Sequence, residues 1–348
     1  MIRVLVAVLV VVVLGVALWS VLGQRSADDA GEPSDEVASD TDRDGAGGGG
    51  ADDDPTEADD RADADRRTGD RTDGDTGGAP PGDAAGDRPS TAVLWSGTFD
   101  ADDWPQHFGV VAESRTFAEA VDVGPDGRED VLRIDFGGAG ERWGIDYRSS
   151  LDDLDLPALN AVEFGYDAYF ASGFEFIGDG KFGGLAGISD GLDPLDTSSG
   201  GDFNDQSFSA RAMWQRDRGV VGYLYVARAD GLAIDDDDNF GFGIQVPFVA
   251  DDGATAGIVS TGVWHRITHR VVMNTPGEAD GVYQLAIDGH RGIDLHDVEF
   301  RTGAADDLAV NQLMSTWFFG GGPDQFPTRE NTAYTANWTL AIPEDLLD

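Results

Sequence analysis

Five side chains suited to acid–base chemistry or anion binding lie in three short stretches near the middle of this 348-residue chain. Lys181, in "FEFIGDGKFGGLAG", is the only lysine, although the chain has 22 arginines among its 23 Lys and Arg residues. Ser209 and Arg211 stand in "SFSARAMW", and Tyr223 and Tyr225 stand in "VGYLYVA". Arginine can bind a carboxylate through two hydrogen bonds, and lysine or tyrosine can move a proton when its surroundings shift its pKa.

Four of these residues are predicted to meet on one hairpin. With the two-residue period of a strand, "SFSARAMW" has an apolar face and a second face, which holds Ser209 and Arg211. The apolar face, expected in the core, consists of Phe208, Ala210, Ala212 and Trp214; the other, expected outside it, consists of Ser207, Ser209, Arg211 and Met213. After the turn "QRDRGV", matching apolar faces predicts Arg211 opposite Tyr223 and Ser209 opposite Tyr225. The alternative is an ordinary solvated sheet face, because Arg and Tyr also pair well across strands without any substrate.

Lys181 is expected in a glycine-rich loop. This loop does not fit a phosphate-binding loop, because the glycine spacing is absent and Phe182, not Ser or Thr, follows the lysine. Taken alone, glycine-rich loops are usually only turns.

The elements that must position these residues are predicted to be strands. From Leu94 onward, short alternating runs end at Gly, Asp, Asn or Pro, and no long helical period interrupts them. Examples are "VLRIDFGG", "AVEFGYDAYF", "FSARAMW", "VGYLYVAR", "WHRITHRVVMN" and "VYQLAIDG". The pattern predicts an all-β domain over residues 92–348, built as an antiparallel sandwich or jelly roll.

The N-terminal segment 1–23 is predicted to be a membrane anchor. Residues 4–23 are uncharged and mainly apolar, enough to cross a hydrocarbon core of about 30 Å as one helix. Arg3 precedes this run and dense acid follows Arg25, so the N-terminus should stay inside the cell. The run exceeds a secretory apolar region and lacks an A-x-A cleavage site, which favours a single-pass membrane protein with an extracellular C-terminal domain. Secretion after signal cleavage is the alternative.

Residues 24–91 are predicted to be a disordered, acidic linker rich in Asp and Gly. They include "DGAGGGGADDDPTEADD" and contain no aromatic residue, so they cannot bury enough apolar surface to offset chain entropy.

The composition predicts a halophilic, haloarchaeal protein. The chain has 66 acidic residues and a formal charge of −43, a self-repulsion that molar salt would screen. This charge disfavours nucleic acid as a partner. The absence of Cys excludes disulfides, thiol nucleophiles and cysteine metal sites.

The histidines are not expected to bind metal. His265 and His269, in "WHRITHRVV", share a face, but on a strand their spacing is too wide for one ion. Both are interpreted as sheet-packed or solvated, and His107 is a weak further candidate. No metal and no cofactor is expected.

Five stretches together resemble a known family. In order they are "GDGKFGGLAG", "FSARAMWQ", "GYLYVA", "GVWHRITHRVVMNTPGEADGVYQLAIDG" and "STWFFGGG". They resemble polysaccharide lyase family 14, the alginate and glucuronan lyase-like group with a concanavalin-like jelly roll, over roughly Ala161 to Leu340. The resemblance implies a catalytic set of a lysine in the glycine-rich loop, a Ser-x-Arg and a Tyr-x-Tyr, which fall here on Lys181, Ser209, Arg211, Tyr223 and Tyr225. Two departures are the acidic stretch between Gly187 and Ser207, and Phe182 in place of an aliphatic residue; both could remodel the cleft.

The resemblance implies a lyase that cleaves an alginate- or glucuronan-like polymer, an acidic polysaccharide containing uronate, by β-elimination; the N-terminal segment would make it extracellular. Arg211 or Lys181 would neutralise the substrate carboxylate, and Ser209 would orient Arg211 or a sugar hydroxyl. Lys181, Tyr223 and Tyr225 all remain candidates for the base. A non-catalytic carbohydrate-binding module and a cell-surface structural protein are the competing functions, and the oligomeric state is open.

Overall fold

The computed structural model describes residues 92–100, 103–138, 140–234, 242–249 and 257–347. The membrane anchor predicted for residues 1–23 and the linker predicted for residues 24–91 lie outside these ranges. In the described part of the chain, no helix is both long enough and apolar enough to cross a bilayer.

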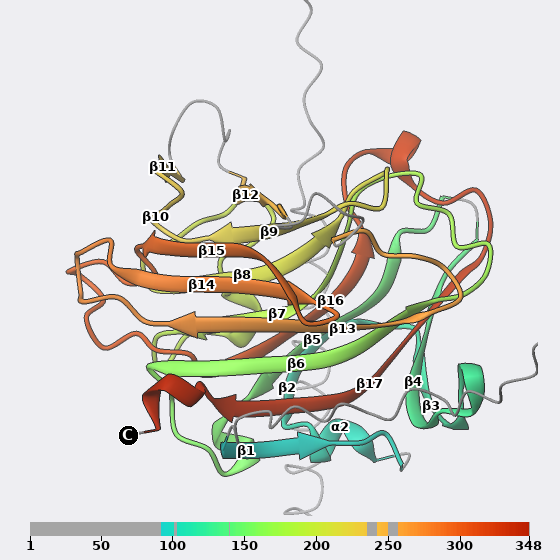
Figure 1. Cartoon of the computed structure of the whole chain (residues 1–348), viewed down its shortest axis with the longest axis horizontal. Helices are drawn as coiled ribbons and strands as arrows, with labels where there is room; N and C mark the ends of the chain where they lie inside the picture. The colour runs from blue at the N-terminus through green and yellow to red at the C-terminus, as the bar shows by residue number, and fades with distance from the viewer. Residues whose placement is uncertain (1–91, 101–102, 139, 235–241, 250–256, 348) are drawn as a thin grey trace, which may run out of the picture. The chain divides into compact units, whose positions relative to one another are not determined.

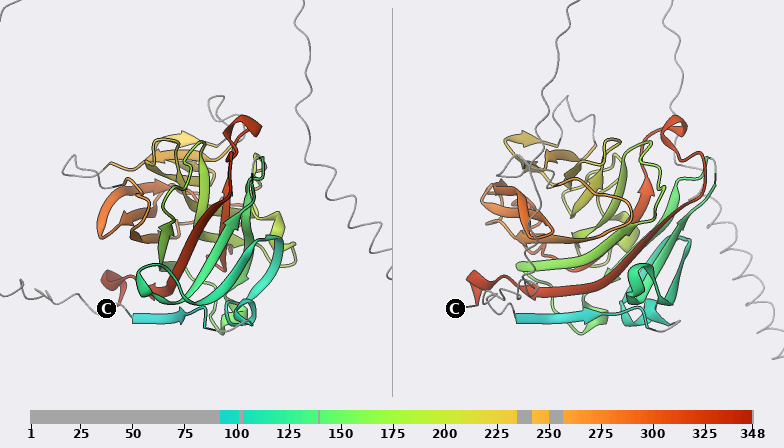
Figure 2. Two further views of the ribbon diagram at one scale, coloured as in Figure 1. Left: turned by 90° about the vertical axis from the view of Figure 1, so that its right-hand side faces the viewer. Right: turned by 45° about the vertical axis from the view of Figure 1, so that its right-hand side comes forward.

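Two antiparallel sheets make up most of the domain (Figure 1). The larger has eight strands in the order β15-β14-β13-β6-β17-β4-β3, with β1 also paired to β17. Its strands are β1 (Ala92–Gly97), β3 (Ala118–Val123), β4 (Glu129–Phe136), β6 (Ala161–Phe170), β13 (Trp264–Val272), β14 (Gly281–Ile287), β15 (His290–Val298) and β17 (Asn331–Ile342). The long strand β17 bends along its length (Figure 2).

The second sheet has seven strands in the order β12-β9-β8-β7-β16-β5-β2. They are β2 (Val110–Thr116), β5 (Trp143–Ser150), β7 (Gly180–Ile188), β8 (Ser207–Trp214), β9 (Val220–Tyr225), β12 (Ile244–Pro247) and β16 (Gln312–Phe319). The remaining short elements are the strands β10 (Arg228–Ala229) and β11 (Leu232–Ala233), the helix α2 (Trp104–His107), and five 3-10 turns. The prediction of an all-β, antiparallel sandwich is confirmed.

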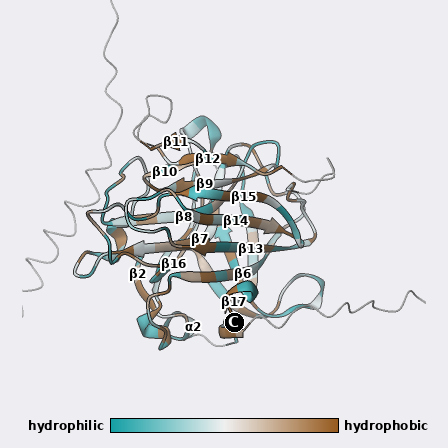
Figure 3. Ribbon diagram, turned by 60° about the vertical axis from the view of Figure 1, so that its left-hand side comes forward, coloured by the Kyte–Doolittle hydropathy of each residue, from teal (hydrophilic) through white to brown (hydrophobic). Residues whose placement is uncertain are grey.

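The core lies between the two sheets because each strand turns alternate side chains toward it. Along the strands, hydrophobic and hydrophilic residues are interspersed (Figure 3). Aromatic side chains fill the centre: Trp214 is fully buried and stacks on Phe182 with ring centroids 5.7 Å apart. Phe182 therefore points away from the candidate residues, so a role for it in reshaping the cleft is not supported.

The predicted register of the β8–β9 hairpin is confirmed. Arg211 pairs with Tyr223, and Ser209 pairs with Tyr225. Phe208 and Leu224 lie in the core, as the apolar pattern predicts.

The second face of β8 lies outside the core between the sheets, as expected, but the alternative of an ordinary solvated sheet face is wrong. Every residue of β8 and β9 is buried, and Ser209 and Arg211 are 0% and 2% exposed. Strand alternation gives the direction of each side chain, whereas it does not show that the loop between β7 and β8 folds back over this face.

The glycine-rich stretch around Lys181 is a strand, not the loop expected from its composition. Residues Gly180–Ile188 form β7, which pairs with β8 on one side and β16 on the other. A Cβ at Gly184 would lie 2.2 Å from the carbonyl oxygen of Ala210, so glycine allows close approach of β7 to β8 next to a β-bulge.

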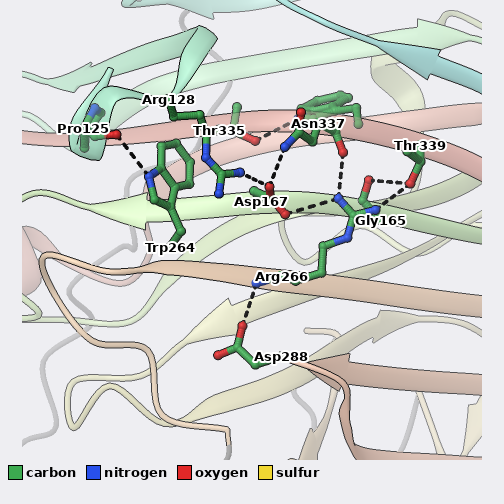
Figure 4. Close-up of polar contacts among 11 residues, drawn as sticks. Pro125, Arg128, Gly165, Asp167, Trp264, Arg266, Asp288, Thr335, Asn337 and Thr339 are labelled. Atoms are coloured by element: carbon green, nitrogen blue, oxygen red, sulfur yellow. Dashed lines mark hydrogen bonds and ion pairs between the residues drawn. The ribbon is translucent and has the colours of Figure 1, made fainter. Parts of the chain in front are cut away.

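A buried carboxylate ties the turn before β4 to the outer surface of the eight-stranded sheet (Figure 4). Asp167 on β6 accepts hydrogen bonds from Arg128, Arg266 and Asn337. The Arg128 guanidinium also lies over the Trp264 ring, 4.2 Å from its centroid. This network joins strands that are far apart in the sequence, on the sheet that does not carry the candidate site.

Candidate active site

The five candidate residues share one face of the seven-stranded sheet, called here the site face: the face turned away from the eight-stranded sheet. The core side of β8 is marked by Tyr283 of β14, whose hydroxyl donates to the Arg211 carbonyl at 3.4 Å. The Arg211 side chain extends in the opposite direction, toward the aromatic rings of Tyr223 and Tyr225. Lys181 joins them from β7, so three adjacent strands supply the set.

Lys181 is half-buried, and its ammonium lies over the Tyr223 ring, with Nζ 4.9 Å from the centroid. Nζ would be only 2.4 Å from a Cβ at Gly320, so the glycine after β16 leaves room for the lysine. Burial of the ammonium, with the nearby guanidinium of Arg211, lowers the pKa of Lys181 to about 8. An appreciable fraction of the amine is therefore unprotonated near neutral pH.

Arg211 is the buried cation of the site. Its Cζ lies 5.5 Å from the Tyr223 ring centroid and 5.8 Å from that of Tyr225. Nη1 donates to Thr316 Oγ1 at 3.3 Å, and Nε has no hydrogen-bond partner within the described part of the chain. Burial lowers the pKa of this guanidinium below its ordinary value.

Tyr223 and Tyr225 bring their hydroxyls together. The two oxygens are 3.3 Å apart, and the rings meet edge to face with centroids separated by 5.5 Å. Burial, followed by the neighbouring Tyr225, raises the pKa of Tyr223 above its usual range, so this phenol keeps its proton. Tyr225 Oη also accepts a hydrogen bond from the Gly201 backbone N–H at 2.7 Å.

Ser209 is buried beside Tyr225, but its hydroxyl donates to the Ser198 carbonyl at 2.7 Å. The structure thus links Ser209 to the loop above it, where the sequence led us to expect a contact with Arg211 or a sugar.

The long acidic stretch noted in the sequence forms a loop over one side of this face. Residues 189–206, called here the acidic loop, reach Tyr225 through Gly201, Ser209 through Ser198, and Gln312 through Thr197. The Thr197 hydroxyl donates to Gln312 Oε1 at 2.8 Å, so the loop extends from β9 across to β16. These contacts place the acidic loop directly against Ser209 and Tyr225.

Sequence reasoning missed several neighbours of the set. Arg148 on β5 lies in the same cross-strand row as Arg211, through Met314 and Gly184, and forms a buried ion pair with Asp146. The alternation of polar and apolar residues in "WGIDYRSS" was an available signal, but only the pairing of β5 with β16 places it beside the site.

The histidines are not part of the site. His269 is fully buried in the other sheet, with Nδ1 3.2 Å from Tyr283 Oη, and burial lowers its pKa to about 3. His265 pairs with Asp288 at 2.8 Å, while His107 is exposed 3.8 Å from Asp103. Both sheet histidines are packed, as interpreted from the sequence. Across the described ranges, no group of three or more His, Asp or Glu side chains is arranged to hold a metal ion.

Comparison with known proteins gives a family and a fold. The family model Polysaccharide lyase 14 matches residues 133–337, beginning before the stretch over which the sequence resemblance was strong. The marine PL-14 alginate lyase from Aplysia kurodai has a similar structure, with a TM-score of 0.61 and 22% identity over 73% of this chain and 100% of that one. No curated protein sequence matches the chain.

Two other solved structures share the fold. Alginate lyase vAL-1 from Chlorella virus has a TM-score of 0.55 and 22% identity, covering 72% of this chain and 100% of its own. Alginate lyase Aly36B has a TM-score of 0.53 and 18% identity, covering 72% and 98%. Because the family model spans more than half of the sequence, the chain belongs to the polysaccharide lyase 14 family and is a polysaccharide lyase.

Proposed function

We propose that this protein cleaves a uronate-containing polymer, alginate- or glucuronan-like, by β-elimination at the site face. One observation carries the proposal: an amine with a lowered pKa, a buried guanidinium and two facing phenol hydroxyls converge from β7, β8 and β9. The solved structures named as alginate lyases, which share the fold, support an acidic polysaccharide as the substrate class.

The reaction needs a base, an acid and a stabiliser of negative charge. The base removes the C5 proton of the uronate, the C4–O bond to the leaving sugar breaks, and a C4–C5 double bond forms. A proton must be delivered to the departing oxygen. The carboxylate next to C5 gathers negative charge during this change, and a fixed cation there is the electrostatic stabilisation that usually contributes most.

Arg211 is assigned to that carboxylate. Its Nε–H is buried with no partner among the described residues, and the guanidinium is held by rings and by Thr316, so a carboxylate that reached it would satisfy an unpaired donor. A planar guanidinium also matches both oxygens of a carboxylate.

Lys181 is assigned as the base and the tyrosine pair as the proton donor. The amine of Lys181 has a pKa of about 8 and adjoins the Tyr223 ring, so its neutral form is available to take the C5 proton. The raised pKa of Tyr223 keeps its hydroxyl protonated before the reaction. During the reaction Tyr225 gives its proton to the leaving oxygen and takes up the proton of Tyr223, whose hydroxyl oxygen lies 3.3 Å away. Ser209 positions the acidic loop over Tyr225.

The test is a screen of polyuronates in molar salt, with the absorbance of the new C4–C5 double bond as the signal. Alginate, glucuronan and a neutral glucan would be compared, using the wild type and Lys181→Arg. We expect unsaturated product from at least one polyuronate, none from the glucan, and a loss of at least about 100-fold in the variant. Binding of a polyuronate without unsaturated product would overturn the proposal.

The location and salt requirement are proposed from the sequence. Residues 4–23 would anchor the protein in the cell membrane with the lyase domain outside, and the charge of −43 would require molar salt for stability. Protease treatment of intact cells should release the lyase domain, and the unfolding midpoint should rise with salt. Retention of the domain in protease-treated cells would contradict the first expectation.

A further inference from the structure

A pair of aromatic rings continues the site face beyond Lys181. Phe318 of β16 pairs directly with Lys181, and Trp143 of β5 pairs directly with Phe318. Directly opposed residues point to the same face of a sheet. Lys181 Nζ lies 5.5 Å from the Phe318 ring centroid, which places the rings next to the amine.

The rings are packed against each other and against a second cation. The Trp143 and Phe318 centroids are 4.6 Å apart, and the Arg142 guanidinium lies over Trp143, 4.7 Å from its centroid. Arg142 also lies 5.7 Å from the Phe326 ring centroid. After burial and the charge of Arg211, the charge of Arg142 also contributes to lowering the pKa of Lys181, so the Arg142 guanidinium is close enough to the amine to affect its protonation. Packing on two rings holds this arginine in one place.

Both rings are half-buried, and so is Arg142. Trp317, next in the chain to Phe318, is fully buried on the opposite, core-facing side of the sheet. The Phe318 and Trp143 rings are not among the buried core residues. A half-buried aromatic pair with an adjacent fixed cation offers a sugar both apolar contact and a partner for its carboxylate.

We propose that Arg142, Trp143 and Phe318 form a sugar-binding subsite for a uronate residue of the polymer next to the cleaved bond. This inference rests on the proposed function, because it assigns the same face an acidic polysaccharide. Phe318 and Trp143 contact the sugar ring, and Arg142 pairs with its carboxylate. This group is called here the aromatic subsite.

The spacing of the strands fits a polymer that crosses them. Adjacent strands are about 4.8 Å apart, so the β5 backbone lies about 10 Å from that of β7. A chain of sugars whose reacting residue lies over Lys181 would therefore reach Trp143 with a neighbouring residue on the side away from β8. Substrates too short to extend in that direction should not need the aromatic subsite.

The experiment compares Trp143→Ala, Trp143→Phe and Arg142→Gln with the wild type on short and long uronate oligomers in molar salt. For long oligomers, KM should rise about tenfold or more in Trp143→Ala and Arg142→Gln, the range for losing an aromatic contact or a charged hydrogen bond. The kcat should change only a few-fold, and Trp143→Phe should recover most of the affinity. The shortest cleavable oligomer should show little effect.

The chain offers a matched control on the other sheet. Trp264 is also half-buried and also lies under an arginine, with the Arg128 guanidinium 4.2 Å from its ring centroid. Trp264→Ala removes a comparable cation–aromatic contact far from Lys181. Arg133→Gln is the control for loss of positive charge, because Arg133 is 41% exposed on that sheet. Neither control should change KM.

The outcomes separate the subsite from the reaction. If the wild type yields unsaturated product and Trp143→Ala and Arg142→Gln keep its KM on long oligomers, the subsite is wrong and the proposed function stands. If no polyuronate is cleaved, the same variants are tested by calorimetry with uronate oligomers. Binding that is lost in Arg142→Gln and kept in Arg133→Gln would then support the subsite while the proposed function fails, and equal binding by both would overturn it.

Discussion

The backbone N–H of Gly201 donates a hydrogen bond to the Tyr225 hydroxyl oxygen at 2.7 Å. This contact joins the acidic loop to β9 at the point where the two tyrosine hydroxyls meet, 3.3 Å apart. When Tyr225 gives up its proton to the leaving oxygen, negative charge develops on the Tyr225 oxygen until the proton of Tyr223 replaces it, and a fixed amide donor stabilises that transient charge. The acidic loop thus contributes a main-chain group to the proposed proton donor.

The first prediction is that Gly201→Ala lowers kcat by about tenfold or more, the cost of misplacing one hydrogen bond to a charged oxygen. Gly201 has a φ of 94°, which strains alanine, and its Cβ would lie 3.2 Å from the Phe242 ring, so either the loop or that ring must shift. Initial rates of unsaturated product on the cleaved polyuronate would measure the change.

Gly200→Ala is the matched control for that prediction. Gly200 also has a positive φ, of 68°, but a Cβ there would meet nothing within 4 Å. It should retain nearly full kcat. An equal loss in both variants would show that general loop strain, not the Gly201 amide, determines the rate.

The second prediction concerns the pH dependence of cleavage. As the base, Lys181 must be neutral, so kcat/KM should rise with pH to a plateau above a pKa of about 8. Lys181→Arg should lower turnover at least about 100-fold, because the guanidinium stays protonated throughout this range. A rate that is flat between pH 6 and 9 in the wild type would contradict Lys181 as the base.

The hairpin that carries four of the candidate residues could be predicted from the sequence because its information is local. Period-two alternation in β8 and β9 fixes which side chains share a face, and matching the apolar faces fixes the register that places Arg211 opposite Tyr223. The joining of Lys181 to this hairpin depended on a family resemblance, since nothing in the strand pattern shows that β7 pairs with β8.

The parts of the site that the sequence did not predict come from long-range pairing. Composition suggested a loop around Lys181, because glycines are frequent in turns, whereas here glycine allows β7 to approach β8 closely at Gly184. The Gly201 contact depends on the path of a long loop across the sheet, and the alternation of polar and apolar residues does not predict that path. Trp143 and Arg148 reach the site only because β5 pairs with β16, far away in the sequence.

The third prediction links the proposed base to stability. The pKa of Lys181 is lower in the folded protein, about 8, than its ordinary value of 10.5, so between these two values the unfolded chain binds more protons. Stability should therefore rise with pH in this window, and below it the buried ammonium lowers stability. Lys181→Met should raise the free energy of unfolding at pH 7 by about 1–3 kcal/mol while abolishing cleavage.

Denaturant titrations of the wild type and Lys181→Met at pH 7 and pH 10, in the same molar salt, would check this. The stabilisation should be clear at pH 7 and shrink as the pH approaches 10.5. A variant less stable than the wild type at pH 7 would show that the ammonium is better accommodated than its burial implies.

The fourth prediction concerns Asp167, which is 9% exposed and accepts hydrogen bonds from Arg128, Arg266 and Asn337 (Figure 4). Asp167→Asn keeps the shape but removes the charge between two guanidinium groups. The change leaves two guanidinium groups, 29% and 36% exposed, without their buried carboxylate, so the free energy of unfolding should fall by about 2 kcal/mol, between the costs for exposed and for fully buried pairs.

Asp135→Asn is the control for Asp167, because Asp135 pairs with Arg133 at 3.0 Å while both side chains are more than 40% exposed. An exposed pair is well solvated, and its loss should cost about 1 kcal/mol or less. Asp167→Asn should leave KM and kcat of the folded enzyme unchanged, because the network lies on the outer surface of the eight-stranded sheet and the site face belongs to the other sheet. Equal losses of stability in the two variants, measured in the same molar salt, would show that salt screens both pairs alike and that the Asp167 network does not hold the turn before β4 in place.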